Sequence, residues 1–370
     1  MFAFHIVLRG EKMNIAVIFG GESVEHDVSV LTGLSVMKNL SKKYTIVPIY
    51  ITHSGIWLTG KALLKNSIYE KQVQGNSCYF ANNSLELCVK HWFKTTKVHI
   101  DCALLCLHGG LGEGGGVQGV LETNHVPYTS CGVGASSVCM DKVFTKLICR
   151  ALLIDILPFV SGTKESIKSK VAENKLDYPL IVKPAHCGSS VGISIANNEA
   201  DLGKSLELSC QFDDKILIEP KLGNFRELNI AVLVGNEKIE FSEIEEVICE
   251  GIYDFEHKYK VSNTKRVVPA EIDEAICAQI KHIVTLFCRE CDIFGAVRFD
   301  FLLGDKLYLN EVNTIPGNLA FYLWKNLSYT KLLSILIENA IRRKNNKNHI
   351  TQIKTNLLNN LDSIKPICHK

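Results

Sequence analysis

The chain has 370 residues, of which 46% are hydrophobic and 22% charged, enough for two or three domains with substantial cores. Its formal net charge of +2 argues against a nucleic-acid-binding protein, which needs a strong excess of basic side chains. No apolar run reaches the roughly 18 residues that would span a bilayer, so a membrane protein is not expected either.

Segment 1–12 looks like an extension or an upstream start, because a cleaner strand begins after Met13. It has no leading basic region and no small-residue cleavage site, so it is a poor secretory signal and we expect a cytoplasmic protein. The fourteen cysteines are scattered through apolar segments, and the single CxxC pair, Cys288 and Cys291, has no second ligand pair for zinc. Free, reduced and buried thiols are the expected state.

Strands and helices alternate in the first 130 residues, with strands predicted at 14–19, 44–51 and 103–107 and helices at 24–40 and 117–124. Apolar residues of the first helix recur at i, i+4, i+7 and i+10, on one helical face: Val24, Val28, Leu31 and Leu34. This alternation predicts a parallel α/β sheet. The elements predicted after a linker near 130–135 are a helix at 142–153, strands at 180–183, 191–195 and 227–234, a helix at 273–288, a hairpin, and a helix at 329–343.

The hairpin segment RFDFLLGDKLYLNEVNTIPG, residues 298–317, interrupts a strand-like pattern with polar side chains. Gly304–Asp305 suits a two-residue turn, because glycine tolerates positive φ. Such a turn would place Arg298 opposite Glu311, with Asp300 and Glu311 as diagonal neighbours. Since side chains alternate with period two, four polar groups are expected on one face: Arg298, Asp300, Glu311 and Asn313.

Two carboxylates and an amide oxygen are a hard-oxygen set suited to Mg²⁺, which bridges to substrate phosphates. An adjacent arginine could stabilise an anionic transition state. The competing hypothesis is a salt-bridged sheet face in which Arg298 pairs with Asp300 and Glu311. The hairpin alone does not separate these two hypotheses.

Two further segments have the composition of phosphate-binding loops. HGGLGEGGG, residues 108–116, contains GxGxxG between a strand and a helix, although no GxxxxGK[ST] P-loop occurs in the chain. Backbone N–H groups ahead of a helix can also bind an anion, and His108 suits either a core or a functional position. IVKPAHCGSSVGI, residues 181–193, places Lys183 at a strand end before a loop of small residues; the same pattern also fits a plain hairpin with an exposed lysine.

Seven motifs, in order, resemble those of the D-alanine–D-alanine ligases of the ATP-grasp superfamily. They are GGESVEHDVS, LHGGLGEGGGVQGVLE, MDK, PLIVKPAHCGSSVGI, ILIEPKL with RELNIAVL, GIYDFEHKY, and VRFDFLL with NEVNTIPG. The resemblance covers residues 14–324. It implies an α/β fold with α+β C-terminal parts: an N-terminal substrate domain at 13–130, a two-domain ATP-grasp module at 131–222 and 223–346, and a polar tail at 347–370.

The resemblance also implies roles for residues within these motifs. Two Mg²⁺ or Mn²⁺ ions would be held by Asp300, Glu311 and Asn313. The residues that match ATP contacts are Lys142, Lys183, Ser190, Glu219, Leu222 and Glu227. The residues that match the substrate and closure network are Glu25, His108, Ser189, Lys258, Tyr259 and Arg298. In this scheme Glu25 holds the ammonium of the first D-alanine, and Arg298 steadies the tetrahedral oxyanion.

The implied reaction uses ATP and two molecules of D-alanine, and supplies a dipeptide for peptidoglycan. The first carboxylate attacks the γ-phosphate to give an acyl phosphate, because a free carboxylate is a poor acyl donor. The second amine then attacks the acyl carbon and phosphate leaves. Metal and basic side chains stabilise phosphoryl transfer, and a closing loop keeps water from the acyl phosphate. The family also implies a homodimer.

Three positions depart from the family pattern. Cys187 stands where glutamate is common, and Gly114 where aspartate is common. IPGNLAFYLW replaces a serine-rich segment that contacts the second substrate, and a gapless alignment places Tyr322 at that serine. The second substrate could therefore be D-serine or, less readily, D-lactate. The sequence is also compatible with a relative that binds ATP and amino acid without turnover. An NAD-dependent dehydrogenase is the last hypothesis, and it rests only on the GxGxxG.

Overall fold

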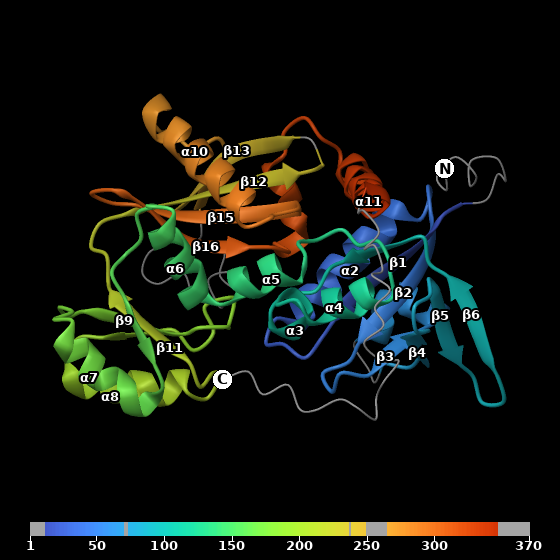
Figure 1. Cartoon of the computed structure of the whole chain (residues 1–370), viewed down its shortest axis with the longest axis horizontal. Coiled ribbons are helices and arrows are strands. Elements are labelled where there is room, and N and C mark those ends of the chain that lie inside the picture. Colours follow the sequence, from blue (N-terminus) through green and yellow to red (C-terminus); the bar gives the residue numbers. More distant parts are fainter. Residues whose placement is uncertain (1–11, 70–72, 237, 249–264, 347–370) are drawn as a thin grey trace, which may run out of the picture.

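Three β-sheets, joined by helices, make up the computed structural model, which describes residues 12–69, 73–236, 238–248 and 265–346 (Figure 1). The first sheet contains parallel strands, and the pairs of the second and third sheets are antiparallel. This is the α/β class, with α+β parts following, that the sequence predicts. Within the described ranges every helix is too short or too polar to span a lipid bilayer.

The first sheet is built around β1 (Asn14–Gly20), which is buried along almost its whole length. It pairs in parallel with β2 (Thr45–Ile51) and β7 (Cys102–Leu105), as expected for an apolar strand covered on both faces. Four short antiparallel strands that the sequence pattern does not predict extend the sheet beyond β2: β3 (Trp57–Thr59), β4 (Asn76–Phe80), β5 (Glu86–Lys90) and β6 (Thr95–His99). The short helices between β3 and β4 are η1 (Lys61–Leu64) and η2 (Asn66–Ile68).

Helix α2 (His26–Leu40) follows β1 and packs on it through a face other than the predicted one. Val24 precedes the helix and is 46% exposed, and Leu31 is 66% exposed, so the predicted apolar face is wrong. The buried face contains Gly33, where a Cβ atom would lie only 2.6 Å from the Phe19 ring of β1. It also contains Ser29, whose hydroxyl group donates to a buried backbone carbonyl 2.7 Å away.

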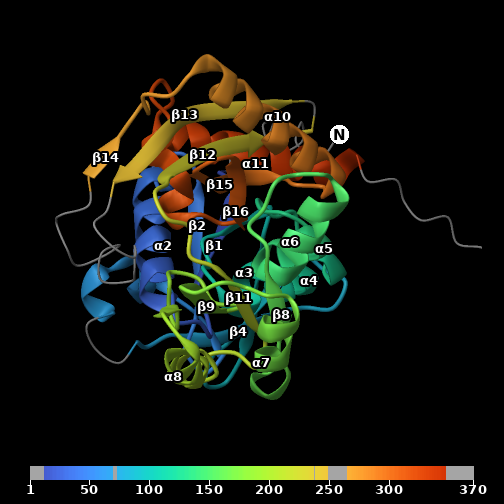
Figure 2. The same cartoon turned by 90° about the vertical axis from the view of Figure 1, so that its left-hand side faces the viewer.

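Helices connect the first sheet to a small second sheet with the strand order β10-β9-β11-β8. The connecting helices are α3 (Gly110–Glu113), α4 (Gly116–Thr123), α5 (Val133–Met140) and α6 (Lys142–Ala151). The strands are β8 (Val160–Gly162), β9 (Leu180–Pro184), β10 (Ser194–Ala196) and β11 (Ile216–Pro220). Helices α7 (Lys164–Glu173) and α8 (Glu199–Ser209) cover one face of this sheet (Figures 1 and 2). Strand β10 begins later than predicted because Ser189, Ser190 and Gly192 have positive φ angles and form a turn.

The third sheet has the strand order β14-β13-β12-β15-β16, with α10 (Glu274–Glu290) packed on it and α5 and α6 beside its edge strand β16 (Figure 1). Its strands are β12 (Arg226–Val234), β13 (Ile239–Ile248), β14 (Lys265–Val267), β15 (Gly295–Leu303) and β16 (Leu307–Asn313). After it come η3 (Gly317–Leu323) and α11 (Tyr329–Asn346). The buried leucines of α11 join the core of the first sheet, so the C-terminal helix ties the third sheet to the first.

The β15–β16 hairpin forms, but its predicted register is wrong. The turn contains three residues, 304–306, because Leu303 pairs with Leu307. A β-bulge then skips Asn310, so that Asp300 pairs directly with Glu311, and Arg298 pairs with Asn313. Opposed residues share one side of the sheet, so the four polar groups still emerge together, as predicted.

Candidate active site

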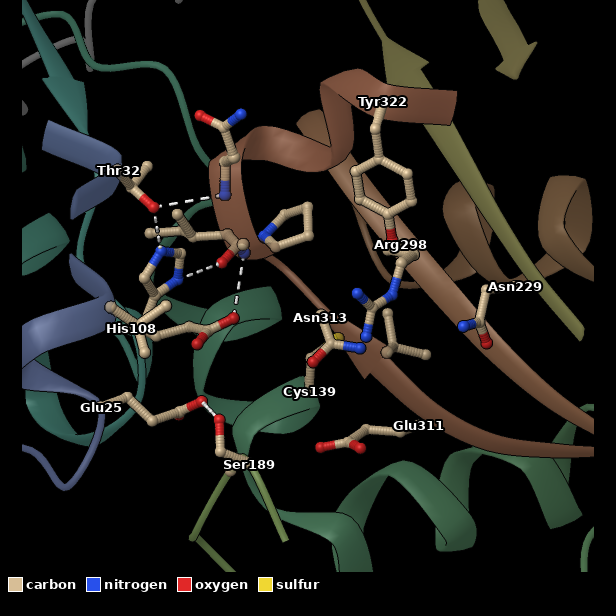
Figure 3. A pocket seen from close by; sticks show the side chains of 18 of the residues that line it. Glu25, Thr32, His108, Cys139, Ser189, Asn229, Arg298, Glu311, Asn313 and Tyr322 are labelled. Carbon is tan, nitrogen blue, oxygen red and sulfur yellow. Dashed lines mark hydrogen bonds between the residues drawn. The ribbon is translucent and has the colours of Figure 1, made fainter. Parts of the chain in front are cut away.

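A cavity of about 440 Å³ lies where α2, the turn before β10 and the third sheet meet (Figure 3). Its walls come from all three sheets and their connections, because residues of β12, β13, β15, β16 and η3 line it together with α2. We call it the substrate cavity. The residues singled out from the sequence for the site that line it are Glu25, His108, Ser189, Glu227, Arg298, Glu311, Asn313 and Tyr322.

A second cavity, of about 520 Å³, lies between the second and third sheets. We call it the nucleotide cavity, and the predicted ATP contacts that line it are Lys183, Glu219, Leu222 and Glu227. Glu227 and Val247 line both cavities, so the two spaces adjoin. The remaining two predicted ATP contacts, Lys142 and Ser190, are not in either lining.

Lys142 lies at the first residue of α6 and reaches toward the hairpin. Its Nζ donates to the backbone carbonyl of Cys187 at 2.5 Å and lies 3.6 Å from Glu311 Oε1. Ser190 follows Ser189 in the turn, and both have the left-handed backbone that non-glycine residues rarely adopt. Both predicted residues therefore lie around the turn at 187–190.

Glu219 is buried between two lysines on the wall of the nucleotide cavity. Lys183 Nζ lies 2.5 Å from Glu219 Oε1, and Lys146 Nζ lies 2.9 Å from Oε2. Burial alone would raise the pKa of Glu219, but the charges of Lys146 and Lys183 outweigh it and lower the pKa to about 2. Lys146 was not predicted; its signal in the sequence is the spacing of four from Lys142, which places both on one side of α6.

The polar face of the hairpin contains the predicted salt bridge. Arg298 donates from Nε to Asp300 Oδ1 at 2.6 Å and from Nη2 to Oδ2 at 2.7 Å, while Asn313 Nδ2 donates to Oδ2 at 3.0 Å. Burial would lower the pKa of Arg298, but the Asp300 carboxylate raises it above the ordinary arginine value. Glu311 faces Lys142 rather than Arg298. The salt-bridge hypothesis thus holds for Arg298 with Asp300, but not with Glu311.

Glu25 and Ser189 meet across the substrate cavity, from the segment before α2 and the turn before β10 (Figure 3). The hydroxyl of Ser189 donates a hydrogen bond to the Glu25 carboxylate. A Cβ atom at Gly188 would overlap the same carboxylate, so a larger residue there would displace the end of the Glu25 side chain. The first and second sheets are joined at this point by one half-buried acidic group.

His108 anchors the chain that follows the hairpin (Figure 3). Its Nδ1 lies 2.7 Å from the carbonyl oxygen of Ile315, which only accepts, so Nδ1 is the donor. Burial lowers the pKa of His108 and keeps the ring neutral, so Nε2 accepts from Thr32 Oγ1 at 2.9 Å. Thr32 Oγ1 in turn accepts from the Asn318 backbone N–H at 3.2 Å. His108 therefore has both a core contact and a place in the cavity wall.

Glu113 is a site residue that the sequence analysis missed. It is buried in the glycine loop and accepts from the backbone N–H groups of Gly109 at 2.9 Å and Ile315 at 3.0 Å. Burial, and then the charge of Glu25, raise its pKa to about 7. The signal was available as the acidic residue of GEGGG, but nothing in the sequence indicates that it reaches Ile315.

Tyr322 lines the substrate cavity close to Arg298 (Figure 3). Its hydroxyl donates to the fully buried Glu245 at 2.8 Å, and burial raises the pKa of Tyr322 to about 12. Asn229 Nδ2 at 3.2 Å and Arg266 Nη1 at 3.4 Å also contact Glu245. The sequence analysis singled out Tyr322 but none of its three neighbours. Of the predicted site residues, Lys258 and Tyr259 lie outside the described residues.

Comparison with known proteins gives the class first, an ATP-dependent ligase with a mixed α/β fold. Family models described as D-ala D-ala ligase N-terminus and C-terminus match residues 14–131 and 148–338. The chain belongs to the D-alanine–D-alanine ligase family, as its motifs predicted.

Relatives and solved structures agree with this assignment. The D-alanine–D-alanine ligase of Thermosipho africanus is 38% identical over 93% of this chain and 98% of its own length. The D-alanine–D-alanine ligase of Chloroherpeton thalassium is 37% identical over 90% of this chain and 97% of its own length. The VanG D-Ala:D-Ser ligase from Enterococcus faecalis superposes with a TM-score of 0.77 at 28% identity, covering 89% of this chain and 100% of that one. The D-alanine–D-alanine ligase from Coxiella burnetii superposes with a TM-score of 0.76 at 26% identity, covering 91% of this chain and 96% of that one.

Proposed function

We propose that this protein joins two D-alanine molecules with ATP, through a D-alanyl phosphate, and so supplies the dipeptide for peptidoglycan precursors. The observation that carries the proposal is the shared wall of Glu227 and Val247 between the two cavities. A nucleotide in one cavity and an amino acid in the other would then place a phosphate beside a carboxylate, as acyl-phosphate formation requires. The relatives named above support the same activity.

The nucleotide cavity fits ATP by its charges. Glu219 and Glu227 are acceptors for the polar edge of a base and for a ribose, and Leu222 supplies an apolar wall. Lys183 at this cavity and Lys142 toward the hairpin supply positive charge on the phosphate side, and Ser190 would add a donor from the turn. A nucleotide with this path would run from the second sheet toward Glu311.

The hairpin residues fit a hard divalent cation. Asp300, Glu311 and Asn313 supply two carboxylates and an amide on one face, the donor set that Mg²⁺ or Mn²⁺ prefers. These three residues would hold one or two such ions, which when bound neutralise the charge of the transferring phosphate. Asp300 also holds the guanidinium of Arg298, so its carboxylate links the metal position to the oxyanion position.

The chain's own side chains have separate tasks in this proposal. Glu25 accepts the ammonium of the first D-alanine, while Ser189 fixes the orientation of its carboxylate. Neutral His108 holds the backbone at Ile315 in place beside the reacting carboxylate. Arg298, fixed by two hydrogen bonds to Asp300, stabilises the negative oxygen that forms when the second amine attacks.

Further parts of the proposal follow from the family resemblance. Lys258 and Tyr259 would close over the site during the reaction. We propose domains at 13–130, 131–222 and 223–346, because one sheet falls within each range. We also propose a cytoplasmic homodimer that acts on small molecules.

The second substrate is tested by pairing D-alanine with D-alanine, D-serine and D-lactate, and measuring ADP release and product mass. We expect Mg²⁺-dependent ADP release with D-alanine alone and a D-alanyl-D-alanine product. Release only when D-serine is added would favour the activity named for the Enterococcus faecalis structure. ATP binding without any turnover would favour an inactive relative, and a thermal shift with NAD would revive the dehydrogenase hypothesis.

A further inference from the structure

The turn at 187–190 is held at its base by a cluster of side chains to which the family resemblance assigns no role. His186 Nδ1 lies 2.8 Å from Asp213 Oδ2, and His186 Nε2 lies 3.2 Å from Asp141 Oδ2. Lys215 Nζ lies 2.6 Å from the same oxygen of Asp141. We call these four residues the His186 clasp. It joins the end of β9, the start of α6 and the start of β11.

The clasp connects to Lys142 through the backbone. Asp141 is the N-cap of α6 and accepts from two backbone N–H groups of its first turn, at 2.8 and 3.2 Å. The next residue, Lys142, donates from its side chain to the carbonyl of Cys187 and from its backbone to the carbonyl of Ala185 at 3.0 Å. Lys142, which faces Glu311, is therefore hydrogen-bonded to the residues on both sides of His186.

The ring of His186 can make both side-chain contacts only as an imidazolium. Carboxylate oxygens accept and do not donate, so both ring nitrogens must carry hydrogen. The charged groups that face the ring are Asp141, Asp213 and Lys215, with the Cys187 thiol adjacent in the chain. The hydrogen bonds to Asp141 and then Asp213 raise the pKa of His186 to about 9. A neutral ring would turn one contact into a repulsion between two acceptors.

We propose that His186 is a positioning residue for ATP: as an imidazolium bridging Asp141 and Asp213, it holds the turn at 187–190 and Lys142 in the geometry that receives the phosphates. The inference rests on the proposed nucleotide site. The geometric basis is that the His186 ring contacts both Asp141 and Asp213, and that Asp141 is also the N-cap of α6. An isolated surface ion pair would contribute little, but here both aspartates are nearly buried and one of them caps a helix.

The sign of the pH dependence follows from the direction of the pKa shift. The folded protein holds the His186 proton more tightly than the unfolded chain, so the clasp is complete below the ordinary value of 6.5 and is lost as pH rises through about 9. ATP affinity should therefore fall between pH 8 and 10. An arginine at this position cannot lose its proton in that range and has a forked donor set for two carboxylates.

The test measures the dissociation constant of Mg²⁺–ATP by calorimetry from pH 7.5 to 10. For the wild type we expect a rise of about tenfold centred near pH 9, the size of one charge-assisted hydrogen bond. His186→Gln should start about tenfold weaker and stay flat, and His186→Arg should start near wild type and stay flat. His282→Gln, on the exposed side of α10, is the matched control and should follow the wild type.

Thermal unfolding of each variant shows that it is folded, and carbon-13 NMR of labelled histidine shows whether the resonance missing in His186→Gln titrates near pH 9. ATP binding by His186→Arg with the same pH curve as the wild type would overturn the clasp while leaving the proposed function intact. A wild-type protein that binds no ATP at pH 7.5 would overturn both.

Discussion

Replacement of Glu219 by glutamine tests the most completely buried charge cluster of the site. The pKa of Glu219 falls from the ordinary 4.5 to about 2 on folding, a difference of 2.5. Each pKa unit corresponds to about 1.4 kcal/mol, so the ionised carboxylate contributes on the order of 3 kcal/mol to stability at neutral pH, and the burial of Lys183, which lowers the pKa of that lysine, offsets part of it. The figure needs little reduction for solvent screening, because the side chain is only 4% exposed.

Calorimetry on Glu219→Gln at pH 7 should show a fall in Tm on the order of 5 °C. The matched control is Glu207→Gln, since Glu207 lies 3.9 Å from Lys164 but its side chain is 68% exposed, and an exposed pair contributes little. ATP affinity should fall in Glu219→Gln and stay unchanged in Glu207→Gln. Equal, small Tm changes in the two variants would refute the electrostatic account of the lysine pair.

The same reasoning gives a pH signature. The folded carboxyl of Glu219 has the lower pKa, so its contribution is present above about 4.5 and is lost as pH falls through about 2. The Tm difference between wild type and Glu219→Gln should therefore shrink across this acidic range. A difference that stays constant down to pH 2 would mean that the variant loses packing rather than charge pairing.

Three further substitutions test the substrate cavity. Glu311→Ala should reduce ATP turnover at least a hundredfold in a coupled ADP assay while Tm changes little, and unchanged turnover would show that the hairpin face is misassigned. Gly188→Ala should cause a comparable loss of turnover because its Cβ would overlap Glu25, whereas Gly134→Ala, with open space around its Cβ, should be neutral. Tyr322→Phe removes a hydrogen bond to the buried Glu245, so we expect the KM of the second substrate to rise about fivefold in initial-rate assays. An unaltered KM would show that Tyr322 does not take part in binding the second substrate.

The hairpin shows which part of a site a sequence can predict. Alternation with period two is a local property, so two pairs of residues could each be assigned to one face of their own strand from the sequence alone, Arg298 with Asp300 and Glu311 with Asn313. The register in which β15 and β16 pair could not be predicted in this way. A three-residue turn by itself would place Asp300 opposite Asn310 and send Glu311 to the other face. The bulge at Asn310 restores the pairing, and no residue type in this stretch marks it.

Helix α2 shows the opposite case, in which a clear pattern gave the wrong face. Hydrophobic periodicity assumes that polar residues face water, but Ser29 is fully buried because it binds backbone groups of β1 and the chain after β7. The apolar residues Val28 and Leu31 instead line the substrate cavity. A helix that serves a site can therefore bury polar residues and leave apolar ones facing a ligand.

The segment after the hairpin depends on contacts that lie far away in the sequence. Asn318, Leu319 and Ala320 all have left-handed backbones, with φ of 48°, 54° and 49°, a conformation that costs about 1 kcal/mol or more at each non-glycine residue. Such a turn persists only where its surroundings hold it, and here Thr32 of α2 binds the Asn318 N–H while His108 binds the carbonyl of Ile315. Both contacts come from the first sheet and its helix. The position of Tyr322 in the substrate cavity is thus set by the docking of the N-terminal part of the chain, which is why residues 317–323 alone could not predict it.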